Sequence, residues 1–427
     1  MFRFIYNLFM PAVFIFFLPQ LILKYRSRGG WKSTYGERFA RFGNRRKSLA
    51  AHNGAIWIHA VSVGETVVAL SLIKAYLAKH PERKFIISTT TTTGQDVART
   101  QCPPNTEVIF CPLDFPWMVK SVLKLLKPAL LVIFETEIWP NLVTLAGKQH
   151  VPVVLVNGRL SDRSAEHYRR MRFFFDPLLR KFDLILAQSD NDAERFRSVS
   201  PHAIVENGGN MKFDQVIPEL PETNELGSYI GSDPEQTVIL AASTHPDEEE
   251  LIVKCYLALC KKYSKLKLVL VPRHAERGND LAAMLREKGC NFIQKSRSAT
   301  SDGSADILLA DTTGEMLLLM KNADIVIMGK SFNGHDEGHN LIEPALLAKP
   351  IVTGPVLRNF RYIFGVLKNA DALLTATDAE LESVLDKLIA SPELREELGK
   401  RASGIIGRNR GATAKAVDAL ESFISKN

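Results

Sequence analysis

Three carboxylates follow apolar runs of the chain at points where the pattern turns polar. Glu65 closes the segment from Trp57 to Glu65, in which a short apolar run breaks into a Ser/Gly turn ahead of helical spacing. Ligands of open α/β sheets collect beyond the carboxyl ends of the strands, so a carboxylate there is a candidate general base. The alternative interpretation is a first-turn Glu that stabilises the helix dipole.

Glu135 and Glu137 stand two residues apart after another apolar run, and Pro140 follows at the expected start of a helix. These carboxylates could orient a substrate hydroxyl beside Glu65, and helix capping is the alternative. Residues 88–95 form a hydroxyl-rich loop before a further helix. That loop could present hydroxyls and backbone N–H groups to a polar ligand, or it could be an ordinary Thr-rich N-cap.

The second half of the chain offers groups that bind anions. Ser243, Thr244 and His245 form a polar turn ahead of a helix whose first turn is acidic. Free N–H groups at a helix start bind phosphate, although a plain capped helix explains the same pattern. Arg273 and His274 follow a hydrophobic strand and supply a cation and an imidazole that suit phosphate or carboxylate.

A polar segment, residues 334–344, opens another expected helix, and its Glu343 could bind a ribose. A metal site at His335 and His339 is disfavoured, because both lie in a Gly-broken loop and the HExxH order is absent. GxGxxG, Walker and GxSxG motifs are also absent from the sequence, so nothing supports a simple dinucleotide-binding, ATPase or α/β-hydrolase function. We predict no metal and no cofactor.

The elements that must position these residues alternate between strand-like and helical patterns. Such alternation predicts parallel sheets covered by helices, and it restarts after a Gly-, Pro- and acid-rich stretch, residues 208–233. We therefore expect an α/β protein with two Rossmann-like halves that face a cleft. The predicted strands are 55–62, 85–90, 107–112, 129–135, 151–157, 183–188 and 203–207 in the first half, and 238–242, 266–272, 307–310, 325–328 and 351–353 in the second.

The N-terminus differs in composition from the rest of the chain. Phe4 to Leu23 is apolar and aromatic over about the length that crosses a bilayer. Residues 1–50 hold ten Lys and Arg and one acid, Glu37. The net positive charge of this segment is therefore larger than the formal charge of +7 for all 427 residues. The rest is slightly acidic, which argues against nucleic acid and favours an anionic membrane surface as partner. The positive-inside rule places the remaining chain on the cytoplasmic side, whether the segment spans the bilayer or lies in one leaflet.

Basic and aromatic residues interleave between residues 159 and 181, beginning with Arg159. Such a face suits an anionic lipid headgroup and its acyl chains, and a solvated helix face with a buried aromatic side is the alternative.

Taken in order along almost the whole chain, these motifs resemble the 3-deoxy-D-manno-oct-2-ulosonic acid (Kdo) transferases of lipopolysaccharide assembly, which are family 30 glycosyltransferases with the GT-B fold. The motifs that carry the resemblance are Tyr35 to Arg38 (YGER), His59 to Glu65 (HAVSVGE), Ser88 to Gly94, Glu135 to Pro140 (ETEIWP), Asn157 to Arg159, Gly208 to Asp214 (GGNMKFD), Pro272 to His274 and Gly338 to Pro344 (GHNLIEP). One departure is Met328 to Phe332, which has a single Gly and a Lys where a Gly-Gly-Ser-like loop is expected.

The resemblance implies transfer of Kdo from CMP-Kdo to a lipid A precursor such as lipid IVA, with inversion at the anomeric carbon. It also implies an enzyme held at the bacterial inner membrane by one N-terminal anchor. The implied domains are an anchor at 1–25, an acceptor domain at 26–212, a linker at 213–233 and a CMP-Kdo domain at 234–427. The implied base is Glu65. The implied acceptor-binding residues are Glu37, Ser62, Gly64, Thr92, Gly94, Glu135, Glu137 and Arg159, and the donor-binding residues are Lys212, Ser243, Thr244, His245, Arg273, His274, Asn340 and Glu343.

Two competing functions remain open from the residues. Another membrane-associated GT-B enzyme would use a nucleoside-diphosphate sugar, and a non-catalytic membrane scaffold would bind no sugar nucleotide. A donor-binding screen separates these functions from Kdo transfer.

Overall fold

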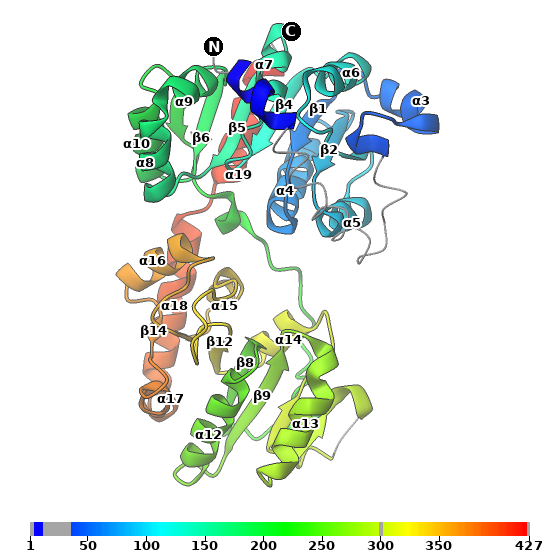
Figure 1. Ribbon diagram of the computed structural model, residues 1–427. Coiled ribbons are helices and arrows are strands. Elements are labelled where there is room, and N and C mark those ends of the chain that lie inside the picture. The colour runs from blue at the N-terminus through cyan, green and yellow to red at the C-terminus, as the bar shows by residue number, and fades with distance from the viewer. Residues whose placement is uncertain (1–3, 12–35, 299–301, 425–427) are drawn as a thin grey trace. The chain divides into compact units, whose positions relative to one another are not determined.

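The computed structural model describes residues 4–11, 36–298 and 302–424. They form two compact units (Figure 1), the first comprising residues up to Asp214 together with those from Asn409 onward, and the second Gln215–Arg408. The described residues contain no helix with both the length and the apolar character needed to cross a bilayer. Of the predicted anchor, residues 4–11 are helical and the rest lies outside the described residues.

The first unit is built on a seven-stranded parallel sheet in the order β3-β2-β1-β4-β5-β6-β7. Its strands are β1 (Ile56–His59), β2 (Phe85–Thr89), β3 (Thr106–Phe110), β4 (Leu130–Phe134), β5 (Val153–Gly158), β6 (Leu184–Ala187) and β7 (Val205–Asn207). Alternate residues of each strand face opposite sides, so Trp57 joins one apolar core and its neighbours Ile56 and Ile58 join the other. A sheet covered on both faces explains why the strands read as continuous apolar runs.

Helices cover both faces of this sheet. They are α3 (Arg46–Ala50), α4 (Val63–Lys79), α5 (Thr92–Gln101), α6 (Pro116–Leu126), α7 (Pro140–Lys148), α8 (Asp162–Arg170), α9 (Arg172–Leu179), α10 (Asp190–Val199) and α19 (Ala412–Ile424), with short 3-10 turns η1 (Gly43–Arg45) and η2 (Met211–Asp214). Helix α19 is the last described element of the chain and packs with α4 against one face of the first sheet (Figure 1).

The second unit holds another seven-stranded parallel sheet, in the order β10-β11-β9-β8-β12-β13-β14. Its strands are β8 (Thr237–Thr244), β9 (Leu266–Pro272), β10 (Phe292–Gln294), β11 (Ile307–Leu309), β12 (Ile325–Met328), β13 (Ile351–Thr353) and β14 (Leu374–Thr375). Its helices are α11 (Gly227–Ile230), α12 (Glu248–Cys260), α13 (Gly278–Glu287), α14 (Met316–Lys321), α15 (Ile342–Leu346), α16 (Arg361–Asn369), α17 (Leu381–Ala390) and α18 (Pro392–Arg408), with 3-10 turns η3 (Ala275–Arg277) and η4 (Lys295–Arg297).

The α/β class, the two parallel sheets and all twelve predicted strands are confirmed. The domain limits differ at the C-terminus, because residues from Asn409 onward belong to the first unit and not to the predicted domain 234–427. The physical reason is apolar packing, since Ala412, Ala416, Val417 and Leu420 are buried in a core of the first sheet. The cleft expected between the two halves stays a prediction.

Candidate functional site

The first sheet changes direction between β1 and β4, because strands are added outward from these two in opposite senses. Loops at such a switch point diverge and leave room for a ligand beyond the carboxyl ends of the strands. Glu65 lies in the first turn of α4, the helix that follows β1, and the loop after β4 carries Glu135 and Glu137. All three predicted carboxylates therefore follow the two strands that flank the switch point.

Glu65 is held at the start of α4 by the turn that precedes it. Ser62 is the N-cap, and its hydroxyl accepts from Glu65 N at 3.4 Å and donates to Glu65 Oε1 at 2.7 Å. Val61 N donates to Oε2 at 2.8 Å. These contacts satisfy free N–H groups of the helix start, so the capping interpretation holds alongside any catalytic one. Gly64, the second residue of α4, is exposed.

Burial and the neighbouring carboxylates raise the pKa values of Glu65 and Glu137. Burial raises the pKa of Glu65, hydrogen bonds from Val61 and Ser62 oppose this, and the charges of Glu135 and Glu137 raise the pKa further. The pKa of Glu137 is also raised, by burial and by Glu135, while a hydrogen bond from Trp139 Nε1 at 3.2 Å lowers it. A carboxylate with a raised pKa is a stronger base, which suits proton abstraction from a hydroxyl.

Glu135 has a left-handed backbone, φ 51°, a conformation that costs a non-Gly residue roughly 1–3 kcal/mol. Its Oε1 lies 3.0 Å from Lys212 Nζ in an ion pair. Lys212, on η2, was predicted to bind the donor. The structure places it in the first unit beside the acceptor-side carboxylates.

His59 is a buried polar residue that contacts this cluster through Trp139. His59, the last residue of β1, is fully buried, and burial lowers its pKa to about 4, so the imidazole is neutral at pH 7. Its Nδ1 lies 3.0 Å from Ser88 Oγ, which also accepts from Trp57 Nε1 at 2.8 Å. The ring meets Trp139 edge-to-face with centroids 5.6 Å apart. This packing supports the indole that donates to Glu137.

The hydroxyl-rich loop serves local structure. Thr91 is the N-cap of α5, its hydroxyl accepts from Gly94 N at 3.1 Å and donates to Val61 O at 3.1 Å. A Cβ on Gly94 would lie 2.8 Å from the Thr91 hydroxyl, so only glycine allows this close approach. Thr92, the first residue of α5, stays partly exposed beside it. The loop thereby braces the turn that holds Glu65.

Two further residues assigned to the acceptor occupy different settings. Glu37 is buried, pairs with Arg45, and accepts from Phe110 N at 2.9 Å, so both of its oxygens serve the fold.

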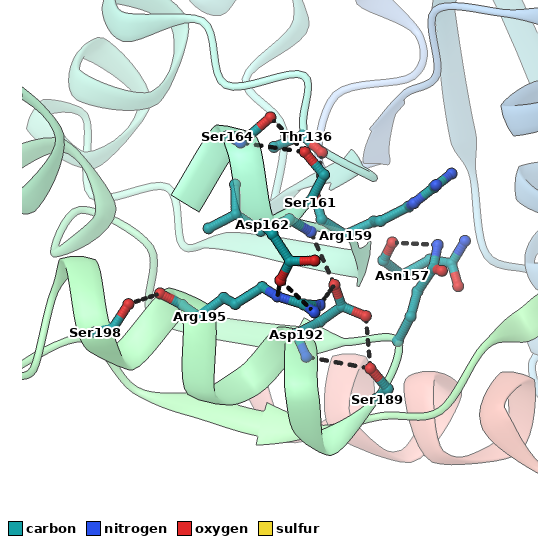
Figure 2. Close-up of polar contacts among 12 residues, drawn as sticks. Thr136, Asn157, Arg159, Ser161, Asp162, Ser164, Ser189, Asp192, Arg195 and Ser198 are labelled. Carbon is teal, nitrogen blue, oxygen red and sulfur yellow. Dashed lines mark hydrogen bonds and ion pairs between the residues drawn. The ribbon is translucent and has the colours of Figure 1, made fainter. Parts of the chain in front are cut away.

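Arg159 follows β5, and Figure 2 shows its side chain extending away from the ion pairs around Arg195. Its carbonyl accepts from the Thr136 hydroxyl. Its guanidinium has no hydrogen bond or ion pair with any described residue, so it is available to an anion.

The second sheet has its own switch point, between β8 and β12. Glu248, fully buried in the first turn of α12, joins the loops that follow these strands. Its oxygens accept from four backbone N–H groups, those of His245 at 2.9 Å, Lys330 at 2.7 Å, Ser331 at 2.8 Å and Phe332 at 2.9 Å. A Cβ on Gly329 would lie 2.5 Å from Ser243 O, so glycine is required where the two loops meet.

The acidic first turn of α12 does not present free carboxylates toward an anion. Besides Glu248, Glu249 pairs with Arg277 at 2.6 Å and Glu250 pairs with Lys288 at 2.8 Å. The negative charges of Glu249 and Glu250 are therefore paired with cations, which reduces their repulsion of a phosphate at this helix start.

Four histidines gather around this switch point. His245 Nε2 lies 3.2 Å from His339 Nε2, and the His245 ring centroid lies 6.1 Å from that of His274 and 5.7 Å from that of His335. Burial first, and then cations that include Arg273 and Lys330, lower the pKa values of both His245 and His339 to about 4. A site in which neighbouring cations suppress protonation favours an anionic ligand.

Arg273 and Lys330 supply fixed positive charge to this cluster. Arg273 is exposed and its side chain has no partner among the described residues. Lys330 has φ 59°, the left-handed conformation for which the expected Gly-rich loop would use glycine. The departure noted in the sequence therefore adds a cation and leaves the loop conformation that glycine favours in place.

The remaining donor-side residues divide between the surface and the core. Asn340 Nδ2 donates to Glu343 Oε1 at 3.1 Å, and Gln215 Nε2 donates to the same oxygen at 3.2 Å. Ser243 is partly exposed with φ 54°. Thr244 is fully buried and its hydroxyl lies 3.5 Å from Val271 O, so it supports the sheet edge and does not reach the surface.

Sequence reasoning did not assign several residues that build these sites. Glu248, Gln215 and Trp139 were not singled out, and His339 was considered only for a metal. An acid at the start of a helix that opens at a strand end, as in Glu65, was the signal that could have identified Glu248. Within the described residues, no group of three or more His, Cys, Asp or Glu side chains has a metal-binding arrangement.

Each of the two units holds one parallel sheet with candidate catalytic or ligand-binding residues at its switch point. This architecture is a GT-B-like glycosyltransferase fold. The fold is similar to that of a glycosyltransferase from Rickettsia africae, with TM-score 0.56, 14% identity, and coverage of 88% of this chain and 100% of that one. A UDP-N-acetylglucosamine 2-epimerase shares it too, with TM-score 0.58, 14% identity, and coverage of 88% and 97%. Identities this low establish the fold alone.

The sequence narrows this class to one family. Residues 33–215 match the family model of 3-deoxy-D-manno-octulosonic-acid transferase. The 3-deoxy-D-manno-octulosonic acid transferase of Haemophilus influenzae is 32% identical over 405 residues, covering 93% of each chain. That of Bordetella pertussis is 31% identical over 415 residues, covering 93% of this chain and 94% of its own. The chain therefore belongs to the 3-deoxy-D-manno-octulosonic acid transferase family and is a glycosyltransferase.

Proposed function

We propose that this enzyme transfers one or more Kdo units from CMP-Kdo to a lipid A precursor such as lipid IVA in lipopolysaccharide inner-core assembly, with inversion at the anomeric carbon. In the proposed step, Glu65 takes the proton of an acceptor hydroxyl. The hydroxyl oxygen forms a bond to the anomeric carbon while the bond from that carbon to the CMP phosphate oxygen breaks. CMP leaves with the bonding electron pair.

The observation that carries this proposal is the grouping of Glu65, Glu135 and Glu137 at one switch point with raised pKa values for Glu65 and Glu137. Capping α4 needs one acid, and it does not need two more carboxylates close enough to oppose the ionisation of the first. A site built for proton abstraction gains from that mutual repulsion.

The second unit supports the donor half of the proposal. Arg273 and Lys330 lie beside the neutral pair His245 and His339, and this set can hold the phosphate of a nucleoside monophosphate sugar. Asn340 and Gln215 both donate to Glu343 Oε1, and the other carboxylate oxygen would accept from ribose hydroxyls. In the proposed site the charges of Arg273 and Lys330 stabilise the departing phosphate.

A lipid-linked acceptor accounts for the composition of the N-terminus. The apolar segment and the basic residues after it would hold the enzyme on the cytoplasmic face of the bacterial inner membrane. Confinement to the surface that contains the acceptor raises the rate of encounter. The free guanidinium of Arg159 would bind an acidic group of that acceptor.

The test is Kdo transfer from CMP-Kdo, generated in situ, to lipid IVA in detergent, with the product mass read for wild type and for Glu65→Ala. We expect a mass increase of whole Kdo units with wild type and no product with Glu65→Ala, while CMP-Kdo binding measured by calorimetry is retained. A folded wild-type protein that gave product only with a nucleoside-diphosphate sugar would overturn the donor assignment. Turnover by Glu65→Ala at the wild-type rate would remove Glu65 from its role.

A further inference from the structure

The helical residues 4–11 carry apolar side chains on their outward side. Phe4, Leu8 and Phe9 point outward with 74%, 61% and 60% of their surface exposed, while Tyr6 and Asn7 are partly buried against the first unit. A helix on the surface of a water-soluble protein turns polar residues outward, whereas this helix exposes Phe4, Leu8 and Phe9. An outward apolar face is stable only when an apolar medium covers it.

The inward face of this helix is held by specific hydrogen bonds. The side-chain amides of Asn7 and Asn141 bond reciprocally, with Asn141 Nδ2 donating to Asn7 Oδ1 at 2.7 Å and Asn7 Nδ2 donating to Asn141 Oδ1 at 3.3 Å. The Tyr6 hydroxyl hydrogen-bonds Asp114. The helix, dark blue in Figure 1, thereby lies beside the start of α7.

Asn141 and Asp114 are themselves parts of the structure that ends the candidate acceptor motif. Asp114 is fully buried, and its two oxygens accept from Asn141 N at 2.9 Å and Leu142 N at 2.8 Å, which caps α7. Helix α7 begins at Pro140, directly after the loop that carries Glu135, Glu137 and Trp139. The helix 4–11 is therefore joined by side-chain hydrogen bonds to the end of the loop that holds two of the three carboxylates.

A second exposed group favours a bilayer surface as the covering medium. Trp117, 63% exposed, shares the outward side of α6 with Lys120 and Lys124, and Asp114 lies three residues before it. A tryptophan beside lysines suits the headgroup level of an anionic bilayer, with the ring at the interface and the ammonium groups toward phosphates. Trp117 is close in sequence to Asp114, and the helix 4–11 contacts the same Asp114–Asn141 cap through Tyr6 and Asn7.

We propose that the Asn7–Asn141 amide pair fixes the Glu135–Trp139 loop at a set height above the lipid surface that Phe4, Leu8 and Phe9 contact. Asn141 and Asn7 are thus positioning residues for a lipid-linked acceptor. The inference rests on the proposed function only in taking the acceptor to be a lipid.

Contact with lipid is tested without any transfer reaction. The full-length protein with Phe9→Trp is reconstituted in vesicles of phosphatidylethanolamine and phosphatidylglycerol, and quenching by brominated acyl chains is compared with wild type. The matched control is Ile204→Trp, because Ile204 is also exposed (59%) but precedes β7 at the amino end of the sheet. We expect quenching of the tryptophan at position 9 and none at position 204. The proposal would be overturned if aqueous iodide, and not the brominated acyl chains, quenched the tryptophan at position 9. It would also be overturned if a second copy of the chain protected this tryptophan from both quenchers.

Coupling to the acceptor loop is tested with Asn7→Leu, which keeps side-chain size and removes the amide pair. We expect the helix to stay in the lipid, the KM for lipid IVA to rise about tenfold, and donor affinity to remain unchanged, because a misplaced acceptor loses orientation. Asn7→Gln keeps an amide and should restore most of the loss. Unchanged kinetics in Asn7→Leu would overturn the positioning role, whereas a different sugar donor in the transfer assay would leave the lipid-contact result intact.

Discussion

Lys212 and Glu135 form an ion pair, 3.0 Å between Nζ and Oε1, that links the end of β4 to the η2 turn. The pair brings a residue assigned to the donor against a residue assigned to the acceptor, both within the first unit. It also places a positive charge next to a cluster of three carboxylates. We expect this charge to oppose the effect of Glu135 on the pKa of Glu65.

Lys212→Met should shift the titration of the base. Loss of the cation leaves the Glu135 charge uncompensated, so the pKa of Glu65 should rise further. The acidic limb of the pH profile of kcat should then move to higher pH, and Lys212→Arg should keep the wild-type profile. An acidic limb that does not move in Lys212→Met would show that the pair has no influence on the titrating group.

Glu65→Gln should separate catalysis from helix capping. Its amide oxygen can still accept from Val61 N and its amide nitrogen can donate to Ser62, so the start of α4 should persist. Turnover should fall by about 10²–10⁴, the usual contribution of a general base. Circular dichroism and donor calorimetry are the controls for folding and for the second unit.

The same variant gives a stability test with a defined sign. Because the folded-state pKa of Glu65 is raised above 4.5, the folded protein binds the proton more tightly than the unfolded chain does. The stability that this provides is fully present below the unfolded value and is lost as pH rises through the folded value. Relative to wild type, Glu65→Gln should therefore gain unfolding free energy as pH rises through that range in urea titrations.

The pair His245 and His339 should make stability fall in mild acid. Both folded pKa values are lowered to about 4 from 6.5, so the unfolded chain takes up protons first between these values. The unfolding free energy should decline as pH falls from 6.5 toward 4, and less steeply in His339→Asn. Equal slopes in wild type and His339→Asn would contradict the burial of a neutral pair.

Glu248→Gln should destabilise the protein strongly. A glutamine oxygen can replace one carboxylate oxygen, but its amide group would face the donors His245 N and Lys330 N. Leaving buried donors unpaired costs about 1–3 kcal/mol each, so we expect a loss of roughly 2–5 kcal/mol in urea unfolding. Glu250→Gln, which removes only an exposed ion pair with Lys288, is the matched control and should change little.

The sheets could be predicted well because continuous apolar runs mark strands buried on both faces. The two strands not predicted, β10 and β14, are the edge strands of the second sheet, and their residues are mostly half-buried, so they depart from the pattern of strands buried on both faces. The acid at the start of α4 was identified because it follows a clear strand end. Residues whose roles depend on distant parts of the chain could not be identified, since three of the four backbone N–H groups that donate to Glu248 come from more than 80 positions later.

The position of Lys212 shows the same limit. Its motif was recognised, but no local pattern reveals that its ammonium group meets Glu135, 77 positions earlier. The Asn7–Asn141 contact spans 134 positions and could likewise not be predicted from the sequence. Local spacing predicts which elements form, and tertiary contacts decide which side chains those elements bring together.

The return of α19 to the first sheet makes the second unit an insertion in the first. Asp214, the last residue before the insertion, accepts from Gly411 N at 2.6 Å and also from Thr413 N, so it caps the helix that resumes the first unit. During synthesis the first sheet must wait for nearly two hundred intervening residues before one of its cores receives Val417 and Leu420. The first unit therefore cannot complete its folding on the ribosome until the second has emerged, which reverses the usual order in which an amino-terminal domain matures first.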